Sequence, residues 1–177
     1  MARIAALAEA DPAAVEALLD AAFGTDRHGR TAYRMRAGVD AVPALSFAAF
    51  GADGALVGTL QSWPLELATD GGPAVPLLLV GPVAVRPDRQ RGGIGRALMQ
   101  AAVDAIDAGR HPPAVLIGDP EYYGRFFGFS AEPTAGWAVP GPVERRRLLA
   151  RAGTGAALPA EGTLQPRRAA QPARFAG

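Results

Sequence analysis

The chain has 177 residues, with 18 lysine plus arginine, 17 aspartate plus glutamate, two histidines, no cysteine and a net charge of +1. This length supports one well-packed domain and is too short for two of ordinary size. The absence of cysteine excludes a disulfide, a thiolate nucleophile and a cysteine-ligated metal, and His28 and His111 lie far apart in sequence. Apolar stretches end well before membrane-spanning length and no signal peptide is recognisable, so we expect a cytoplasmic protein without a metal.

Positive charge is concentrated near the C-terminal end, where residues 141–177 carry seven arginines and two acidic residues. Aromatic residues do not alternate with these arginines, so the pattern favours a solvated end over a nucleic-acid platform. Residues 165–177 contain two prolines and little apolar content. We therefore expect a single domain over residues 1–164, followed by a loose tail.

The N-terminal part predicts a short strand over residues 4–7 and a helix that Asp11 and Pro12 begin and Gly24 ends. A polar loop and a short helix over residues 31–37 follow. The segments 44–50, 55–67 and 75–85 are then predicted as consecutive strands, because turn residues separate their apolar runs. They form antiparallel hairpins in this interpretation.

The second half predicts a helix over residues 95–108 and a buried strand over 114–118. This strand should lie parallel to 75–85, since a helix joins the two in a right-handed crossover. Residues 135–139 are compatible with a strand, and residues 143–152 with either a helix or a strand. Within 75–85, Pro82 cannot donate to a ladder, which predicts an interrupted pairing, a bulge or a strand edge there.

A glycine-rich loop separates the strand 75–85 from the helix that follows. Glycine permits close approach to the backbone, and the first amides of the helix point back into the loop. Arginines flank it on both sides. Bare amides, a helix N-terminus and nearby cations together favour binding of a phosphate group. The residues concerned are Arg91, Gly92, Gly93, Ile94, Gly95 and Arg96.

Two common phosphate-binding motifs do not fit this loop. A P-loop NTPase needs a lysine, and the chain has none; a dinucleotide fingerprint needs a small residue where Leu98 stands. The run Gln90-Arg91-Gly92-Gly93-Ile94-Gly95, preceded by Val83-Ala84-Val85-Arg86-Pro87, resembles the signature loop of the GNAT superfamily of acetyl-CoA-dependent N-acyltransferases. Residues 116–130 resemble the fifth strand, fourth helix and Gly-Phe turn of a bacterial subgroup of these enzymes. The resemblance covers roughly residues 3–135.

This resemblance implies an α/β GNAT fold, in which helices flank a mostly antiparallel mixed sheet that is splayed between its fourth and fifth strands. It also implies acetyl-CoA as cosubstrate. The pantetheine arm would lie in the splay against the backbone of Val83, Ala84 and Val85. The amides from Arg91 to Arg96 would hold the pyrophosphate.

Acetyl transfer needs a group that protonates the departing thiolate, and a tyrosine hydroxyl suits this role. The resemblance implies a tyrosine on the helix after the fifth strand, where Tyr122 and Tyr123 are the candidates. Counting forward from Gly118 favours Tyr123, although the ending Phe126-Phe127-Gly128-Phe129 has one aromatic residue more than the common pattern. The competing interpretation is that both tyrosines only pack against the sheet.

No general base stands out. The candidates are Glu66, Asp119, Glu121 and His28, and a bound water could serve instead. Trp63 and Tyr33 could line the acceptor pocket, although a tryptophan in a strand is more often part of the core. The loop over residues 27–30 lies on the acceptor side in this fold, and its charge could attract an acidic substrate or be solvated.

The sequence therefore predicts an N-acetyltransferase that moves an acetyl group directly from acetyl-CoA to an amine. The acceptor is a small molecule or a peptide, and its identity is not legible. The main alternative is a non-catalytic acyl-CoA-binding sensor or interaction module. We expect no membrane partner, and a homodimer is compatible with the resemblance.

Overall fold

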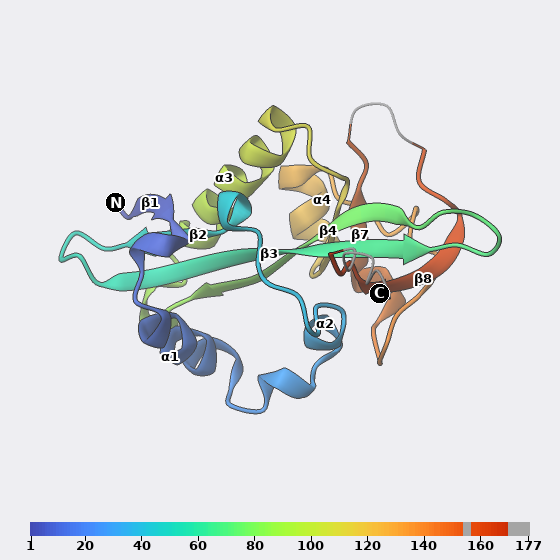
Figure 1. The fold of residues 1–177 in the computed structure, drawn as a ribbon. Helices are drawn as coiled ribbons and strands as arrows, with labels where there is room; N and C mark the ends of the chain where they lie inside the picture. Colours follow the sequence, from blue (N-terminus) through green and yellow to red (C-terminus); the bar gives the residue numbers. More distant parts are fainter. Residues whose placement is uncertain (154–156, 170–177) are drawn as a thin grey trace, which may run out of the picture.

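A mixed β-sheet forms the centre of the protein (Figure 1). The computed structural model describes residues 1–153 and 157–169. Over these residues the strands are β1 (Arg3–Ala6), β2 (Phe47–Phe50), β3 (Leu56–Ala68), β4 (Val75–Val85), β5 (Ala114–Ile117), β6 (Gly136–Ala138), β7 (Leu148–Arg151) and β8 (Glu161–Pro166). The helices are α1 (Pro12–Phe23), α2 (Thr31–Arg34), α3 (Ile94–Ala108) and α4 (Pro120–Phe127).

The strands follow the order β1-β2-β3-β4-β5-β7, with β8 paired to β3 and β6 paired to β8. The hairpins β2–β3 and β3–β4 are antiparallel and β4–β5 is parallel, as the sequence predicted. The pair β6–β8 is also parallel. This mixed, mostly antiparallel sheet flanked by helices confirms the expected fold class.

Helices α1 and α3 cover opposite faces of the sheet (Figure 1). Helix α1 begins where Asp11 accepts a hydrogen bond from the Ala13 amide at 3.1 Å, and its apolar stripe packs on Ala48. Helix α3 packs on the other face, against the neighbouring Ala49. Successive side chains of a strand point to opposite faces, so these two alanines assign one helix to each side.

Close contact between α3 and β3 depends on Gly58. A Cβ atom at this position would lie 2.8 Å from Cγ2 of Ile94 and 3.0 Å from Cδ1 of Leu98. Real Cβ atoms rarely come so near to other carbons, so a side chain would push the helix off the sheet. The glycine therefore sets how closely the first turn of α3, and the loop that leads into it, approach the sheet.

Strands β4 and β5 pair over only two residues each and then separate. Leu78 faces Ala114 and Leu79 faces Val115, and no further pairs join the two strands over the described residues. On the opposite edge of β4 the register with β3 shifts at the Gly81-Pro82 step. The interruption and the bulge expected at Pro82 are thus both present, and they lie where the sheet opens.

The C-terminal part differs from the sequence interpretation. Residues 143–152 contain a short 3-10 turn and then the strand β7, so the strand alternative was right. Strand β8 was not predicted at all, and it includes Gln165 and Pro166, which we had placed in a loose tail. It pairs with β3 over Leu65 to Ala68, and these partners lie about a hundred positions earlier in the chain. Residues 170–177 of the expected tail lie outside the described residues.

The short helix expected over residues 31–37 is α2 and ends at Arg34. None of the described helices is long and apolar enough to cross a membrane.

Candidate active site

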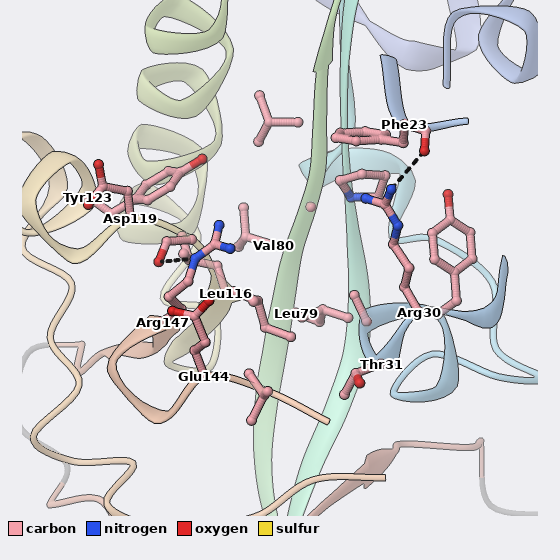
Figure 2. Close-up of a pocket in the computed structure, with 18 of the residues that line it drawn as sticks. Phe23, Arg30, Thr31, Leu79, Val80, Leu116, Asp119, Tyr123, Glu144 and Arg147 are labelled. Atoms are coloured by element: carbon pink, nitrogen blue, oxygen red, sulfur yellow. Dashed lines mark hydrogen bonds between the residues drawn. The ribbon is translucent and has the colours of Figure 1, made fainter. Parts of the chain in front are cut away.

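A cavity of about 800 Å³ opens where β4 and β5 diverge (Figure 2). Five segments of the chain contribute to its walls: the end of α1, the loop into α2 together with α2 itself, the bulged part of β4, the end of β5 with the start of α4, and the segment before β7. The polar and aromatic side chains among the lining residues are Phe23, Arg30, Thr31, Tyr33, Arg34, Asp119, Tyr122, Tyr123, Glu144 and Arg147.

Tyr123 lies at this cavity because α4 starts immediately after β5. Asp119 caps the helix by accepting a hydrogen bond from the Glu121 amide at 3.1 Å, and Pro120 follows at the first helical position. One turn later the Tyr123 ring lies over Gly118. A Cβ atom on Gly118 would be 2.3 Å from Cε2 of that ring, so only glycine allows the ring its position. The Tyr123 hydroxyl points from α4 toward β4 (Figure 2).

Tyr122 lines the same cavity, with its ring perpendicular to that of Tyr123 at a centroid distance of 5.0 Å. Burial raises the pKa of both hydroxyls above the ordinary tyrosine value. Both therefore keep their protons at neutral pH and can act as donors. Both predicted tyrosines reach the cavity, and Tyr123 is the more deeply buried of the two.

Among the four candidate bases, Asp119 is at the cavity wall and the other three are not among its lining residues. Glu121 forms an ion pair with Arg146, and Glu66 accepts a hydrogen bond from Gln165 at 2.6 Å. His28 packs edge-on against the Tyr33 ring. Residues 1–153 and 157–169 contain no group of three or more histidine, cysteine or acidic side chains that could hold a metal ion.

The arginines of the loop over residues 27–30 have different roles. Arg27 is only 2% exposed, and it donates to Asp20 at 2.8 Å and to the Tyr33 hydroxyl at 2.6 Å. It also pairs with Glu16, so its charge fastens the loop to α1 instead of facing a substrate. Arg30, three residues later, lines the cavity.

Trp63 does not line the cavity but supports it from behind. Its indole nitrogen donates to the Gly81 carbonyl at 2.9 Å, which holds the bulge of β4 in place. The Arg36 guanidinium lies 4.0 Å from the Trp63 ring and 3.9 Å from the Tyr33 ring, between the two. Of the two aromatic residues suggested for the acceptor pocket, Tyr33 is therefore at its wall and Trp63 is a layer behind.

The glycine loop presents a set of unused amides at the start of α3. Gly93 caps the helix with a φ of +70°, a conformation that favours glycine. The first helical hydrogen bond runs from the Ala97 amide to the Gly93 carbonyl at 3.0 Å, and the Gly92 amide donates to Arg89. The other amides of the predicted set donate to no described residue; they belong to Arg91, Gly93, Ile94, Gly95 and Arg96.

Two cations stand near these amides. Arg91 is exposed, and the Arg96 guanidinium lies 4.3 Å from the Phe126 ring, so Arg96 joins the loop to α4. Five unpaired amides at the positive end of a fifteen-residue helix form a cradle for an anion.

The backbone of β4 connects this cradle to the cavity. The Arg86 amide donates to the Val57 carbonyl at 2.9 Å, toward β3. Backbone direction alternates along a strand, so Ala84 also turns its N–H and C=O toward β3, whereas Val83 and Val85 turn theirs toward the open side. Of the three residues predicted to meet pantetheine, Val83 and Val85 offer unpaired backbone groups and Ala84 does not.

Sequence reasoning missed Glu144 and Arg147, which reach the cavity from the segment before β7. They are close to α4 only because β7 pairs with β5. Arg147 donates through Nε to the Gly118 carbonyl at 3.4 Å, and the Gly118 amide donates to the Arg147 carbonyl at 2.9 Å. No local motif marked either residue.

Comparisons with known proteins agree with this fold. A GNAT family N-acetyltransferase (YhbS) from Escherichia coli in complex with CoA matches with a TM-score of 0.69 at 20% identity, over 94% of this chain and 89% of that chain. A GNAT family acetyltransferase from Brucella melitensis in complex with acetyl-CoA gives 0.64 at 25% identity, over 94% and 96%. A search of curated proteins finds no match. Residues 3–131 match the family model of the acetyltransferase (GNAT) domain, and the chain therefore belongs to the GNAT acetyltransferase family.

Proposed function

We propose that this protein is an N-acetyltransferase that moves an acetyl group directly from acetyl-CoA to an amine. One observation carries the proposal: a cradle of unpaired amides at α3 continues along an open strand edge into a cavity that Tyr122 and Tyr123 line. The related structures from Escherichia coli and Brucella melitensis contain CoA and acetyl-CoA, which supports the choice of cosubstrate.

The residues fit acetyl-CoA along its length. The unpaired amides of the loop can donate to the pyrophosphate, and the Arg91 and Arg96 side chains add positive charge beside it. Val83 and Val85 have backbone groups free to bond the amides of the pantetheine arm. This arrangement would direct the thioester into the cavity between β4 and β5.

In this proposal, each residue near the thioester has one role in the reaction. The Tyr123 hydroxyl donates a proton to the departing thiolate, and burial keeps that hydroxyl protonated. Gly118 leaves the space in which the Tyr123 ring lies. The attacking amine must first lose a proton. Hydrogen bonding at Glu121 lowers the pKa of Asp119, so this carboxylate at the cavity wall is a weak base and a bound water is the better acceptor. Because the chain has no cysteine, transfer through a cysteine acyl-enzyme is excluded.

The test removes only the hydroxyl of Tyr123. We expect Tyr123→Phe to lower kcat by roughly 10²-fold, the scale of one positioned general acid, with little change in acetyl-CoA affinity. Turnover is followed as thiol release over a panel of amines, amino acids, polyamines, aminoglycosides and peptides. Affinity is measured by calorimetry.

Tyr122→Phe is the matched control, because Tyr122 lines the same cavity but, as the adjacent helical residue, leaves the backbone in a direction about 100° away. Small and equal effects of the two substitutions would reject Tyr123 as the acid. Binding of acetyl-CoA without thiol release from any acceptor would instead identify a non-catalytic acyl-CoA sensor.

A further inference from the structure

Three arginines line the cavity without an acidic partner among the described residues: Arg30, Arg34 and Arg147. Two nearby arginines show the contrast. Arg27 is paired with two carboxylates of α1, and Arg146, next to Arg147, is paired with Glu121. The arginines that face the cavity are therefore ones that form no ion pair among the described residues.

Arg147 is held by its Nε atom alone. That atom donates to the Gly118 carbonyl at 3.4 Å, and the two terminal nitrogens have no hydrogen-bond partner among the described residues. In Figure 2 these nitrogens extend into the space between Tyr123 and Val80. A guanidinium fixed at one corner, with its outer edge free, can bind a planar or tetrahedral oxyanion through two parallel hydrogen bonds.

Arg30 lies across the cavity from Arg147 (Figure 2). Its Nη2 atom donates to the Phe23 carbonyl at 2.8 Å, and its guanidinium lies 5.7 Å from the Phe23 ring. Arg34 donates to the Pro140 carbonyl at 3.4 Å. Each of these contacts is to a neutral carbonyl, which orients the side chain and leaves its full charge in place.

Two carboxylates share the same walls and only partly offset this charge. Asp119 accepts a hydrogen bond at the N-terminus of α4, where the helix dipole compensates a negative charge. Glu144 is exposed and forms no ion pair among the described residues. Three arginines against these two acids leave the cavity positive. All three arginines are exposed, so their attraction for an anion is strongest at low ionic strength.

Building on the proposed N-acetyltransferase activity, we propose that the acceptor is an amine that carries an anionic oxygen group, a carboxylate or a phosphate, which Arg147 and Arg30 bind. Carboxylate and phosphate share the oxygen geometry that a guanidinium recognises. This group would anchor the acceptor while its amine faces the thioester near Tyr123. Polyamines and aminoglycosides, which are cationic throughout, would be repelled.

The experiment compares matched amines. Phenylalanine is compared with phenylalaninamide and phenethylamine, and phosphoethanolamine with ethanolamine, with each rate expressed per unprotonated amine. We expect kcat/KM to be about tenfold higher, or more, for phenylalanine, for phosphoethanolamine or for both than for their counterparts without the anionic group. Which of the two comparisons shows the preference tells whether the site takes a carboxylate or a phosphate.

Arg147→Gln keeps hydrogen-bonding capacity and removes the charge. It should reduce the preference for the anionic acceptor by roughly 10- to 100-fold, mainly through KM, and leave acetyl-CoA affinity unchanged. If Arg147→Gln does not fold, Arg30→Gln tests the same preference for the anionic acceptor. Arg3→Gln is the control, because Arg3 is exposed on β1 and pairs with Glu9.

Calorimetry on the CoA-saturated protein gives a readout that does not need turnover. Transfer to neutral or cationic amines as fast as to anionic ones would overturn this inference and leave the N-acetyltransferase standing. Absence of thiol release, with anionic compounds still bound and Arg147→Gln abolishing that binding, would overturn the activity and leave the anion site standing. Absence of both turnover and selective binding would overturn the inference as well.

Discussion

Adding a single methyl group at Gly118 should impair catalysis by displacing Tyr123. The Cβ atom of an alanine there would lie 2.3 Å from Cε2 and 2.7 Å from Cδ2 of the Tyr123 ring, and 3.1 Å from a Leu116 methyl. Ordinary contact with carbon begins near 3.4 Å. The ring must therefore retreat by about 1 Å, which moves its hydroxyl away from the sulfur that we propose it protonates.

A displacement of this size at a reacting group costs on the order of 10² in rate. We therefore expect Gly118→Ala to lower kcat roughly 10²-fold. Acetyl-CoA affinity should change little, because the loop amides at α3 lie on a different element from Gly118. Overpacking at this position also costs about 1–3 kcal/mol of stability, so circular dichroism and the Tm establish that the variant is folded.

The double variant Gly118→Ala/Tyr123→Phe separates this mechanism from a general disturbance of the site. If the methyl group acts by moving the hydroxyl, the double variant is no slower than Tyr123→Phe, since residues that act as a unit are not additive. Thiol release gives kcat and calorimetry gives the affinity. A folded Gly118→Ala with full turnover would refute the reasoning, as would losses that multiply in the double variant.

Three further outcomes follow from the same geometry. Gly93→Val forces a β-branched residue to a φ of +70°, at about 1–2 kcal/mol, and should weaken acetyl-CoA binding roughly tenfold or more; unchanged affinity in calorimetry would contradict it. Gly58→Ala overpacks α3 against β3 and should lower the free energy of unfolding by about 1–3 kcal/mol, which urea denaturation measures and an unshifted midpoint would exclude. Burial raises the pKa of Tyr123 above the ordinary value of 10.0, so its proton is lost only at higher pH. The alkaline fall of kcat should thus lie above pH 10 and disappear in Tyr123→Phe; a Tyr123-dependent midpoint well below pH 10 would be inconsistent.

Local sequence accounts for the part of the fold that forms the proposed phosphate cradle. The apolar run through β4, the glycines of the loop and the apolar stripe of α3 lie within about 35 consecutive residues. Their structures depend on side-chain periodicity and on conformations that glycine permits, and both can be read from short segments. The same holds for α4, whose Asp119-Pro120 start determines that Tyr122 and Tyr123 follow within the first turn.

The acceptor end of the cavity could not be read in this way. Glu144 and Arg147 reach it because β7 pairs with β5, and Arg27 is neutralised because the loop folds back onto α1. From sequence, the charges of the loop over residues 27–30 could not be told apart. Packing buries Arg27 and leaves Arg30 at the cavity. Strand β8 was not predicted for the same reason, because its partners on β3 are distant in sequence.

By itself, therefore, the sequence determined the fold class, the glycine loop that we propose binds an anion, and the pair of tyrosines, since each depends on neighbours within a few turns of the chain. The tertiary structure alone decided which backbone groups stay unpaired: Val83 and Val85 face the open side of β4, whereas Ala84 bonds β3. It also decided which charges remain unneutralised at the cavity. Strand pairing and ion pairing join residues that are distant along the chain, and no short segment contains both partners.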